Sequence, residues 1–262
     1  MEGPKRCAIA VMAKAPQAGR SKTRLCPPLT ADQAAALSAA FLRDVTENIR
    51  LAGHSASIAG YVAYAPEGSA HLFDGHLAAG TRLVLADGAA VADAAIIGLG
   101  RSLLHAVTSL LALGHEAVCL VNADSPNLPT RFLIDAAAAL ARPGDRIVLG
   151  AADDGGYYLI GLKHPHAAVF RDIAWSTDAV SAQTVQRAEA AKLETVLLPA
   201  WFDVDDMASL HRLHASLTHA DEAPFLAPAT RDWIASNSIV LGTRSEKEQY
   251  AMCGRPGVRR ES

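Results

Sequence analysis

The segment at residues 117–129 constrains the fold most, because a short apolar run ends abruptly at an acid and two prolines. Residues 117–121 are too few for a helix and suit a strand buried on both faces. Asp124 follows at the carboxyl end of this expected strand, and Pro126 and Pro129 cannot continue its hydrogen bonding. Ligands of open α/β sheets bind at such ends, so Asp124 could hold a hard cation such as Mg²⁺. Alternatively, Asp124 caps the turn that follows.

Strand-like and helix-like segments alternate along the whole chain. We expect strands at residues 8–12, 58–64, 82–86, 117–121, 146–151, 157–162 and 195–198. We expect helices over about residues 30–52, 102–113, 130–143, 178–192 and 207–217, with Thr30, Ser102 and Thr130 as caps. Gln33 completes a capping-box pattern with Thr30, and Gly53 is expected to end that helix. The alternation predicts an α/β fold in which helices flank both faces of a mostly parallel sheet.

Composition sets the broad class of protein. The 262 residues, half of them hydrophobic, can form one large domain, which we expect to end near residue 236, before a flexible tail at residues 237–262. Four cysteines without CxxC spacing suit free thiols in a reducing, cytoplasmic compartment. The first apolar run is too short for a signal peptide or a membrane span. A net charge of −3 gives no reason to expect a nucleic-acid partner.

The loop after the first expected strand gathers cations. Lys14, Arg20, Lys22 and Arg24 fall within eleven positions, together with Gly19. Such a loop at the carboxyl end of a strand is suited to grip a polyphosphate. It has neither the Walker A pattern nor GxGxxG, so neither a P-loop NTPase nor a dinucleotide-binding Rossmann domain is supported. A solvated basic loop is the structural alternative.

Two further acidic motifs carry chemical information. Residues 153–158 read DDGGYY, where paired glycines let a ligand approach the backbone and Asp154 can accept hydrogen bonds from hydroxyl groups. The same residues could form a plain hairpin turn. Residues 203–206 read DVDD before an expected helix that Asp206 is placed to cap. Another of these acids could join Asp124 on a metal ion.

Five motifs taken in order resemble a known family. KAPQAGRSKTRL, NADSPNLP, DDGGYYLIGL, WSTD and FDVDD are similar to segments of the nucleotide-diphospho-sugar transferase superfamily, which has a GT-A-type fold. Within it, the chain resembles bacterial radical-SAM/selenodomain-associated glycosyltransferase-like proteins, which are related to phospholactate guanylyltransferase. The resemblance covers roughly residues 8–213 and implies a single-domain GT-A-like fold.

The resemblance also implies roles for individual residues. It implies metal ligation by Asp124 and Asp205, nucleotide binding by Lys14, Gly19, Lys22, Arg24 and Asn122, and catalytic roles for Lys14, Lys22 and Arg24. It implies substrate binding on the acceptor side by Asp154, Gly155, Gly156, Tyr157, Trp175, Ser176 and Thr177. The chain departs from the family at residues 98–102, which read GLGRS instead of Asp-Leu-Gly-x-Arg. It also has Asn122 and Ala123 where the family has small residues before the metal-binding Asp.

The function implied by the resemblance is metal-dependent transfer from an activated nucleotide, with Mg²⁺ or Mn²⁺ as cofactor. The cation-rich first loop favours nucleotidyl transfer from a nucleoside triphosphate to a small phosphate- or phosphonate-bearing acceptor, with release of pyrophosphate. Glycosyl transfer from a nucleotide-sugar is the first alternative. The altered residues 98–102 leave a non-catalytic nucleotide-binding protein as the second.

Overall fold

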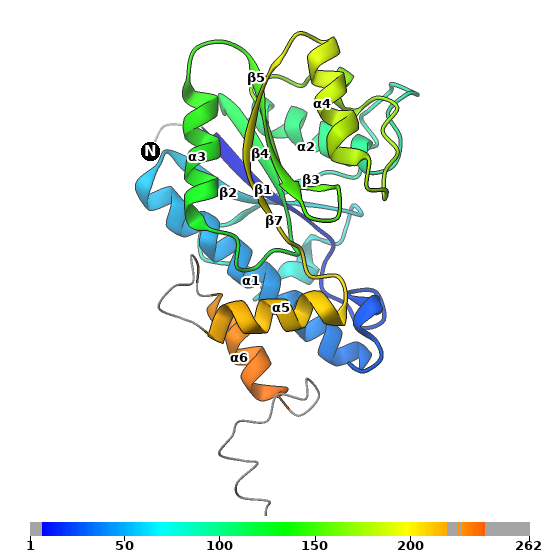
Figure 1. Ribbon diagram of the computed structural model, residues 1–262, viewed down its shortest axis with the longest axis vertical. Coiled ribbons are helices and arrows are strands. Elements are labelled where there is room, and N and C mark those ends of the chain that lie inside the picture. Colours follow the sequence, from blue (N-terminus) through cyan, green and yellow to red (C-terminus); the bar gives the residue numbers. More distant parts are fainter. Residues whose placement is uncertain (1–6, 219–224, 226, 239–262) are drawn as a thin grey trace, which may run out of the picture.

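The computed structural model describes residues 7–218, 225 and 227–238 and contains one seven-stranded mixed sheet (Figure 1). The strands are β1 (Cys7–Ala13), β2 (Ile58–Tyr64), β3 (Arg82–Leu85), β4 (Ala117–Asn122), β5 (Arg146–Ala152), β6 (Tyr157–Leu162) and β7 (Glu194–Trp201). They lie in the order β3-β2-β1-β4-β6-β5-β7. Only β6 runs antiparallel to its neighbours, so the predicted mostly parallel sheet is confirmed.

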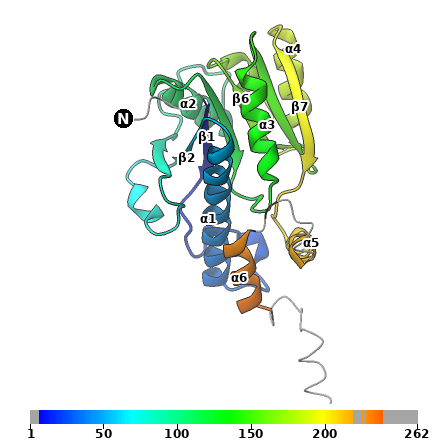
Figure 2. The same cartoon turned by 90° about the vertical axis from the view of Figure 1, so that its left-hand side faces the viewer.

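Helices cover both faces of the sheet. The α-helices of the described residues are α1 (Ala31–Ser55), α2 (Leu99–Ala112), α3 (Thr130–Ala141), α4 (Val180–Ala190), α5 (Met207–Thr218) and α6 (Pro228–Ser236). α1 and α3 lie on one face, and α2 and α4 lie on the other (Figure 2). Alternate residues of β1 explain this, because Ile9 packs into the cluster under α1 and α3, whereas Ala8 and Ala10 pack under α2. The result is a three-layer α/β/α fold.

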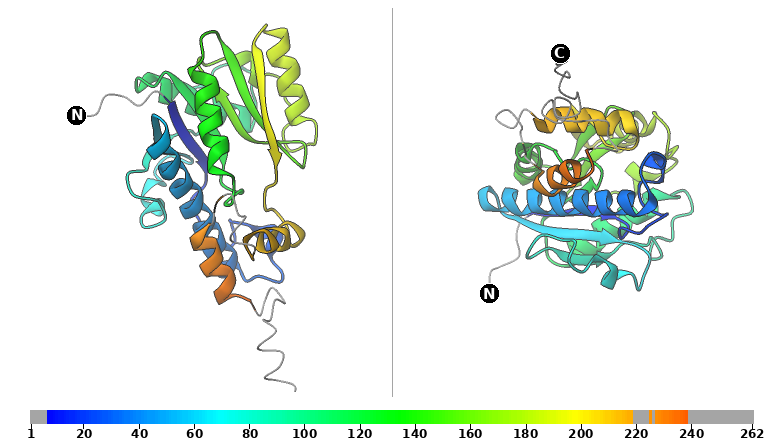
Figure 3. Two further views of the ribbon diagram at one scale, coloured as in Figure 1. Left: turned by 60° about the vertical axis from the view of Figure 1, so that its left-hand side comes forward. Right: turned by 90° about the horizontal axis from the view of Figure 1, so that it is seen from below.

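A third apolar cluster lies at one end of the sheet, where α5 and α6 pack beside the amino-terminal half of α1 (Figure 3). Phe41 of α1, Leu213 of α5 and Trp233 of α6 all belong to it. The carboxylate of Asp44 on α1 accepts hydrogen bonds from the backbone amides of Ala229 (3.0 Å) and Thr230 (2.7 Å) and so caps α6. This helix was not predicted from the sequence.

The ends of several helices and of one strand differ from the expected ones. The Thr30–Gln33 capping box is present, but α1 continues through Gly53 to Ser55. α2 begins at Leu99 after Gly98, which leaves Ser102 inside the helix rather than at its cap. Thr130 is the first residue of α3, and its hydroxyl bonds to the Asn48 side-chain oxygen (2.6 Å) instead of capping. β7 is twice as long as the expected strand at residues 195–198.

Three expectations from composition and length can be compared with the structure. Residues 239–262, which make up most of the expected tail, lie outside the described residues, and the domain boundary near residue 236 stays a prediction. Cys7, Cys26 and Cys119 are free thiols, as expected, and Cys253 lies outside the described part. No described helix has the length and apolar character needed to cross a membrane.

Candidate functional site

Three segments that are distant in sequence meet at the carboxyl edge of the parallel strands. β4 ends there at Asn122 and leads to Asp124, and the turn between β5 and β6 lies at the same edge because β6 runs in the opposite direction. The segment after β7 returns across this edge, since the Val204 amide donates a hydrogen bond to the Asp124 carbonyl (2.9 Å). The Ser125 hydroxyl fixes the same crossing by donating to the Phe202 carbonyl (2.9 Å).

The two acids expected to bind metal meet around Lys22. The ammonium nitrogen of Lys22 lies 2.7 Å from Asp124 Oδ1 and 3.3 Å from Asp205 Oδ1, and it also donates to the Val204 carbonyl. Only 7% of the Lys22 side chain is exposed, whereas the side chains of Asp124 and Asp205 are 37% and 44% exposed, so the buried ammonium meets carboxylates that open to solvent. Arg24 approaches the other oxygen of Asp205 at 3.6 Å. The structure therefore brings Lys22, Arg24, Asp124 and Asp205 together.

An acidic cavity of about 410 Å³ opens next to this triad. Its lining combines residues from all five motifs with two residues outside them, Leu99 and Val180. The motif residues are Arg24, Asn122, Asp124, Asp154, Gly156, Tyr157, Trp175, Ser176, Thr177, Asp178, Asp203 and Asp205. The Asp154 carboxylate is held by the Gly156 amide at 2.8 Å. Burial raises the pKa of Asp203 to about 6, and repulsion from Asp154, Asp205 and Asp124 adds to the shift. We call this the acidic cavity.

The predicted acceptor residues other than Gly155 line the acidic cavity. Gly155 has φ of +89° and lies against the backbone of Asp178, and its carbonyl accepts a hydrogen bond from the Ser181 amide (2.9 Å). This contact joins the DDGG turn to the WSTD loop. The DDGG turn also connects β5 and β6 as a hairpin. The expected hairpin turn and the expected ligand-contact residues are therefore the same residues.

The departure at residues 98–102 has a packing explanation. A Cβ atom at Gly100 would lie 2.9 Å from the Trp175 ring, so the indole packs directly on this helix start. Arg101 turns away from the acidic cavity and donates to the Gly88 carbonyl at 3.1 Å. Leu99, nearly half exposed, lies at the cavity wall instead. The segment thus supports Trp175 rather than presenting an arginine to a ligand.

The cations of the first loop do not all line the same cavity, since Arg24 lines the acidic cavity and others lie elsewhere. Lys14 and Gly19 line a separate cavity of about 450 Å³ together with Arg20. A smaller cavity of about 160 Å³ shares Lys14 with this one and shares Leu99 with the acidic cavity. The three cavities therefore follow one another along the carboxyl edge. Lys14 lies apart from the Lys22 triad, although the sequence grouped the two lysines.

The described residues contain no group of three or more histidine, cysteine or acidic side chains arranged to hold a metal ion. Asp124 and Asp205 nevertheless direct oxygen atoms at one point, which the Lys22 ammonium fills. Asp206 has a structural role, because its carboxylate accepts a hydrogen bond from the Ser209 amide (2.8 Å) at the start of α5, and this bond lowers the Asp206 pKa. That capping role was the predicted one.

Sequence reasoning did not single out Asp178, Asp203 or Leu99 as site residues, although all three line the acidic cavity. Asp178 and Asp203 belong to the WSTD and FDVDD motifs, so their motif position was an available signal. Leu99 lies in the GLGRS segment that was compared with the family's Asp-Leu-Gly-x-Arg, but an apolar residue at a helix start is normally read as part of the core.

The arrangement of the chain is shared with solved structures. It is similar to a provisionally assigned nucleotide-diphospho-sugar transferase from Desulfovibrio desulfuricans G20, with a TM-score of 0.76, 24% identity, and coverage of 91% of this chain and 97% of that chain. It is also similar to CMP:2-keto-3-deoxy-manno-octonic acid synthetase complexed with CTP, with a TM-score of 0.51, 12% identity, and coverage of 82% and 99%. The chain therefore has the nucleotide-diphospho-sugar transferase fold.

Residues 48–177 match the family described as "Uncharacterized protein conserved in bacteria (DUF2064)". The match covers the central part of the chain, from α1 to the WSTD loop. It contains Asp124 and the DDGG turn, and it excludes the first loop and Asp205. No curated protein matches the chain.

Proposed function

We propose that this protein is a metal-dependent nucleotidyltransferase, which transfers a nucleoside monophosphate from a nucleoside triphosphate to a small acceptor and releases pyrophosphate. One observation carries the proposal: Lys22 lies between Asp124 and Asp205, where the acidic cavity adjoins the cavities of the cationic first loop. A donor and an acceptor can therefore occupy neighbouring cavities, with their reacting ends beside the triad.

The cavity of the first loop suits the nucleotide. Lys14 and Arg20 supply two positive charges for a triphosphate, and Gly19 lets its backbone come close. The similar synthetase structure contains CTP, which agrees with a triphosphate donor. We assign Asn122 to the nucleotide as well, because it lines the acidic cavity at the end of β4 and is the strand partner of Met12, which lines the small cavity beside Lys14.

Asp124 and Asp205 fit a divalent ion such as Mg²⁺ or Mn²⁺. Their oxygens already surround one cationic position, and Mg²⁺ is commonly held by one or two carboxylates together with substrate phosphates. When bound, the ion would neutralise charge on the phosphate oxygens. Lys22 would then leave the carboxylates, and its ammonium group would be available to the phosphates.

The transfer step follows from these placements. An oxygen atom of the acceptor attacks the α-phosphorus of the donor, the bond from that phosphorus to the bridging oxygen breaks, and pyrophosphate carries away the negative charge. Lys14, Lys22 and Arg24 stabilise this charge as it develops. Catalysis then depends on positioning and electrostatics, because no protein nucleophile is required.

The acidic cavity narrows the class of acceptor. Asp154 and Asp178 favour hydroxyl or amino groups, which donate hydrogen bonds to carboxylates, and they repel a second anionic group. A reacting phosphate or phosphonate group therefore has to face Lys22 and Arg24. The remainder of such an acceptor would lie against Gly156, Tyr157, Trp175, Ser176 and Thr177.

The proposal is tested by incubating the protein with each nucleoside triphosphate, Mg²⁺ or Mn²⁺, and phospho-acids or phosphonates that carry hydroxyl groups. Acceptor-dependent pyrophosphate release, absent in Asp124→Asn, is the expected result. Release of only nucleoside diphosphate from a nucleotide-sugar would instead show glycosyl transfer, which the name of the Desulfovibrio neighbour favours. Tight nucleotide binding without product would show a binding protein. A cytoplasmic location stays a prediction.

A further inference from the structure

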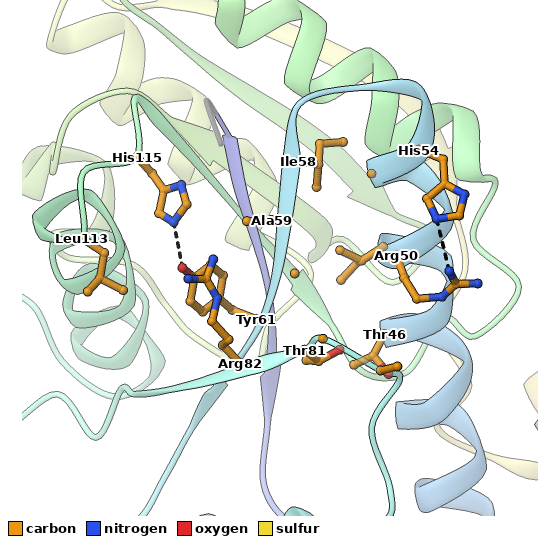
Figure 4. A pocket seen from close by; sticks show the side chains of 15 residues that line it. Thr46, Arg50, His54, Ile58, Ala59, Tyr61, Thr81, Arg82, Leu113 and His115 are labelled. Carbon is orange, nitrogen blue, oxygen red and sulfur yellow. Dashed lines mark hydrogen bonds between the residues drawn. The ribbon is translucent and has the colours of Figure 1, made fainter. Parts of the chain in front are cut away.

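A cavity of about 540 Å³ lies at the amino edge of the sheet, opposite the candidate active site (Figure 4). It exists because β3 is short: its four residues pair only with Tyr61–Tyr64, so residues 58–60 of β2 have no β3 partner. Residues 58–60 line the cavity. A strand of seven residues spans about 20 Å, so this amino-edge cavity is well separated from the Lys22 triad.

The lining of the amino-edge cavity includes two arginines and two histidines, and Arg50 donates a hydrogen bond to Nε2 of His54 at 3.1 Å. Arg50 and His54 of α1 lie on one side, and Arg82 of β3 and His115 lie on the other (Figure 4). No carboxylate of the described residues lines the cavity. The guanidinium of Arg50 is paired with Glu47 at 2.6 and 2.8 Å, which compensates its charge. Arg82 has no ion pair with a described carboxylate, so its charge is available to a ligand.

Arg82 is held on a rigid support. Its guanidinium lies over the Tyr61 ring, 4.4 Å from the ring centre, and this ring is only 1% exposed. The Tyr61 hydroxyl is 2.8 Å from Nε2 of His115, whose side chain is also buried. A stacked guanidinium keeps its in-plane N–H groups available for hydrogen bonding. Because the arginine is ordered before a ligand arrives, less side-chain entropy is lost on binding.

We propose that the amino-edge cavity binds a small phosphate-bearing anion, with Arg82 as the main anchor and His54 on the facing wall. The planar fork of an arginine matches two oxygens of a phosphate group. The cavity volume falls in the range of small-molecule sites, about 300–1,000 Å³. This cavity shares no lining residue with the acidic cavity, so the proposed anion site does not depend on the proposed transfer reaction.

The test uses pyrophosphate as the probe, in EDTA, with the full-length protein. Because Lys14, Arg20 and the exposed Arg24 could also bind this anion, the triple variant Lys14→Gln/Arg20→Gln/Arg24→Gln serves as the background. Isothermal titration of this background is expected to show one binding site. Adding Arg82→Gln is expected to raise Kd at least tenfold, whereas adding Arg131→Gln, a surface arginine of α3 that is 84% exposed, should leave Kd unchanged.

A second measurement guards against a folding defect in the Arg82 variant. In the background protein, backbone amide resonances of Gly60 and Thr81, which line the amino-edge cavity, are expected to shift as pyrophosphate is added. Orthophosphate and a nucleoside monophosphate, titrated in parallel, show whether bare phosphate or a phosphate ester is preferred. No binding in the background, equal binding after Arg82→Gln and Arg131→Gln, or unshifted Gly60 and Thr81 resonances would overturn the proposal.

Discussion

Gly155 and Asp178 approach each other so closely that a Cβ atom on Gly155 would overlap the Asp178 carbonyl oxygen. The contact is between backbones, so it cannot be relieved by moving a side chain. It places the DDGG turn and the WSTD loop at a fixed distance, and both line the acidic cavity. The shape of the candidate acceptor site therefore depends on one missing methyl group.

Replacing Gly155 by alanine is expected to destabilise the protein by about 2 kcal/mol or more, because the backbone clash adds to the strain of a positive φ. Urea unfolding monitored by circular dichroism measures the change. Gly75→Ala is the matched control, since Gly75 has φ of +80° but nothing within 4 Å of a Cβ atom. Equal losses in the two variants would show that the contact with Asp178 is unimportant.

If the proposed function holds, replacing Asp124 or Asp205 by asparagine is expected to lower the rate of pyrophosphate release at least about 100-fold, because each change removes one of the two carboxylates proposed to hold the divalent ion. Initial rates at saturating donor provide the measurement. Asp135→Asn, an exposed acid on α3, should retain full activity. If both site variants retain activity while folded, the metal-dependent mechanism is wrong.

Replacing Lys22 by methionine is expected to tighten Mn²⁺ binding at least tenfold in the absence of nucleotide. The ammonium group competes for the position between Asp124 and Asp205, and its removal leaves two carboxylates without their cation. Isothermal titration with MnCl₂ measures the affinity, and Lys163→Met serves as a surface control. Unchanged or weaker Mn²⁺ binding would show that these acids do not form a metal site.

Replacing Asp203 by asparagine is expected to stabilise the metal-free protein at neutral pH. Burial first, and then repulsion by Asp154, Asp205 and Asp124, raises the pKa of Asp203 to about 6 from an ordinary value of 3.8. A carboxyl group whose pKa is higher in the folded than in the unfolded protein favours folding while it is protonated. Its contribution to the free energy of unfolding is complete below the unfolded-state pKa and is lost as pH rises through the folded-state pKa. Asparagine avoids this loss.

The expected gain for Asp203→Asn is about 1 kcal/mol at pH 7.5, discounted for solvent screening of a partly exposed group, and it should disappear near pH 3.5. Unfolding curves in EDTA at the two pH values give the comparison, and Asp135→Asn should show no such pH-dependent gain. A pH-independent gain would point to a packing effect instead.

The parts of the fold that were predicted depend on local signals. β2 and β6 have the predicted bounds because their apolar runs stop at turn residues, and the Thr30–Gln33 box lies within four residues. Asp124 was placed at the end of β4 for the same reason. Helix α6 was missed because its cap is Asp44, which is close in space but remote in sequence.

The candidate site shows the same limit. The sequence grouped Lys14 and Lys22 because they are near in the chain, but side-chain direction in a loop is set by backbone conformation and by distant partners. Lys22 has a left-handed backbone, with φ of 49°, and its ammonium is bound by Asp124 and Asp205. Lys14 follows directly from β1 and lines the neighbouring cavities instead.

The reversed direction of β6 has a consequence for how this fold could diversify. Because the β5–β6 connection turns back at the carboxyl edge, its length sets the depth of the acidic cavity without altering any strand pairing. Insertions or deletions in this short turn would change which molecules fit while the sheet stays intact. Selection for a new ligand in this cavity could therefore act on a few turn residues and leave the cavities of the first loop as they are.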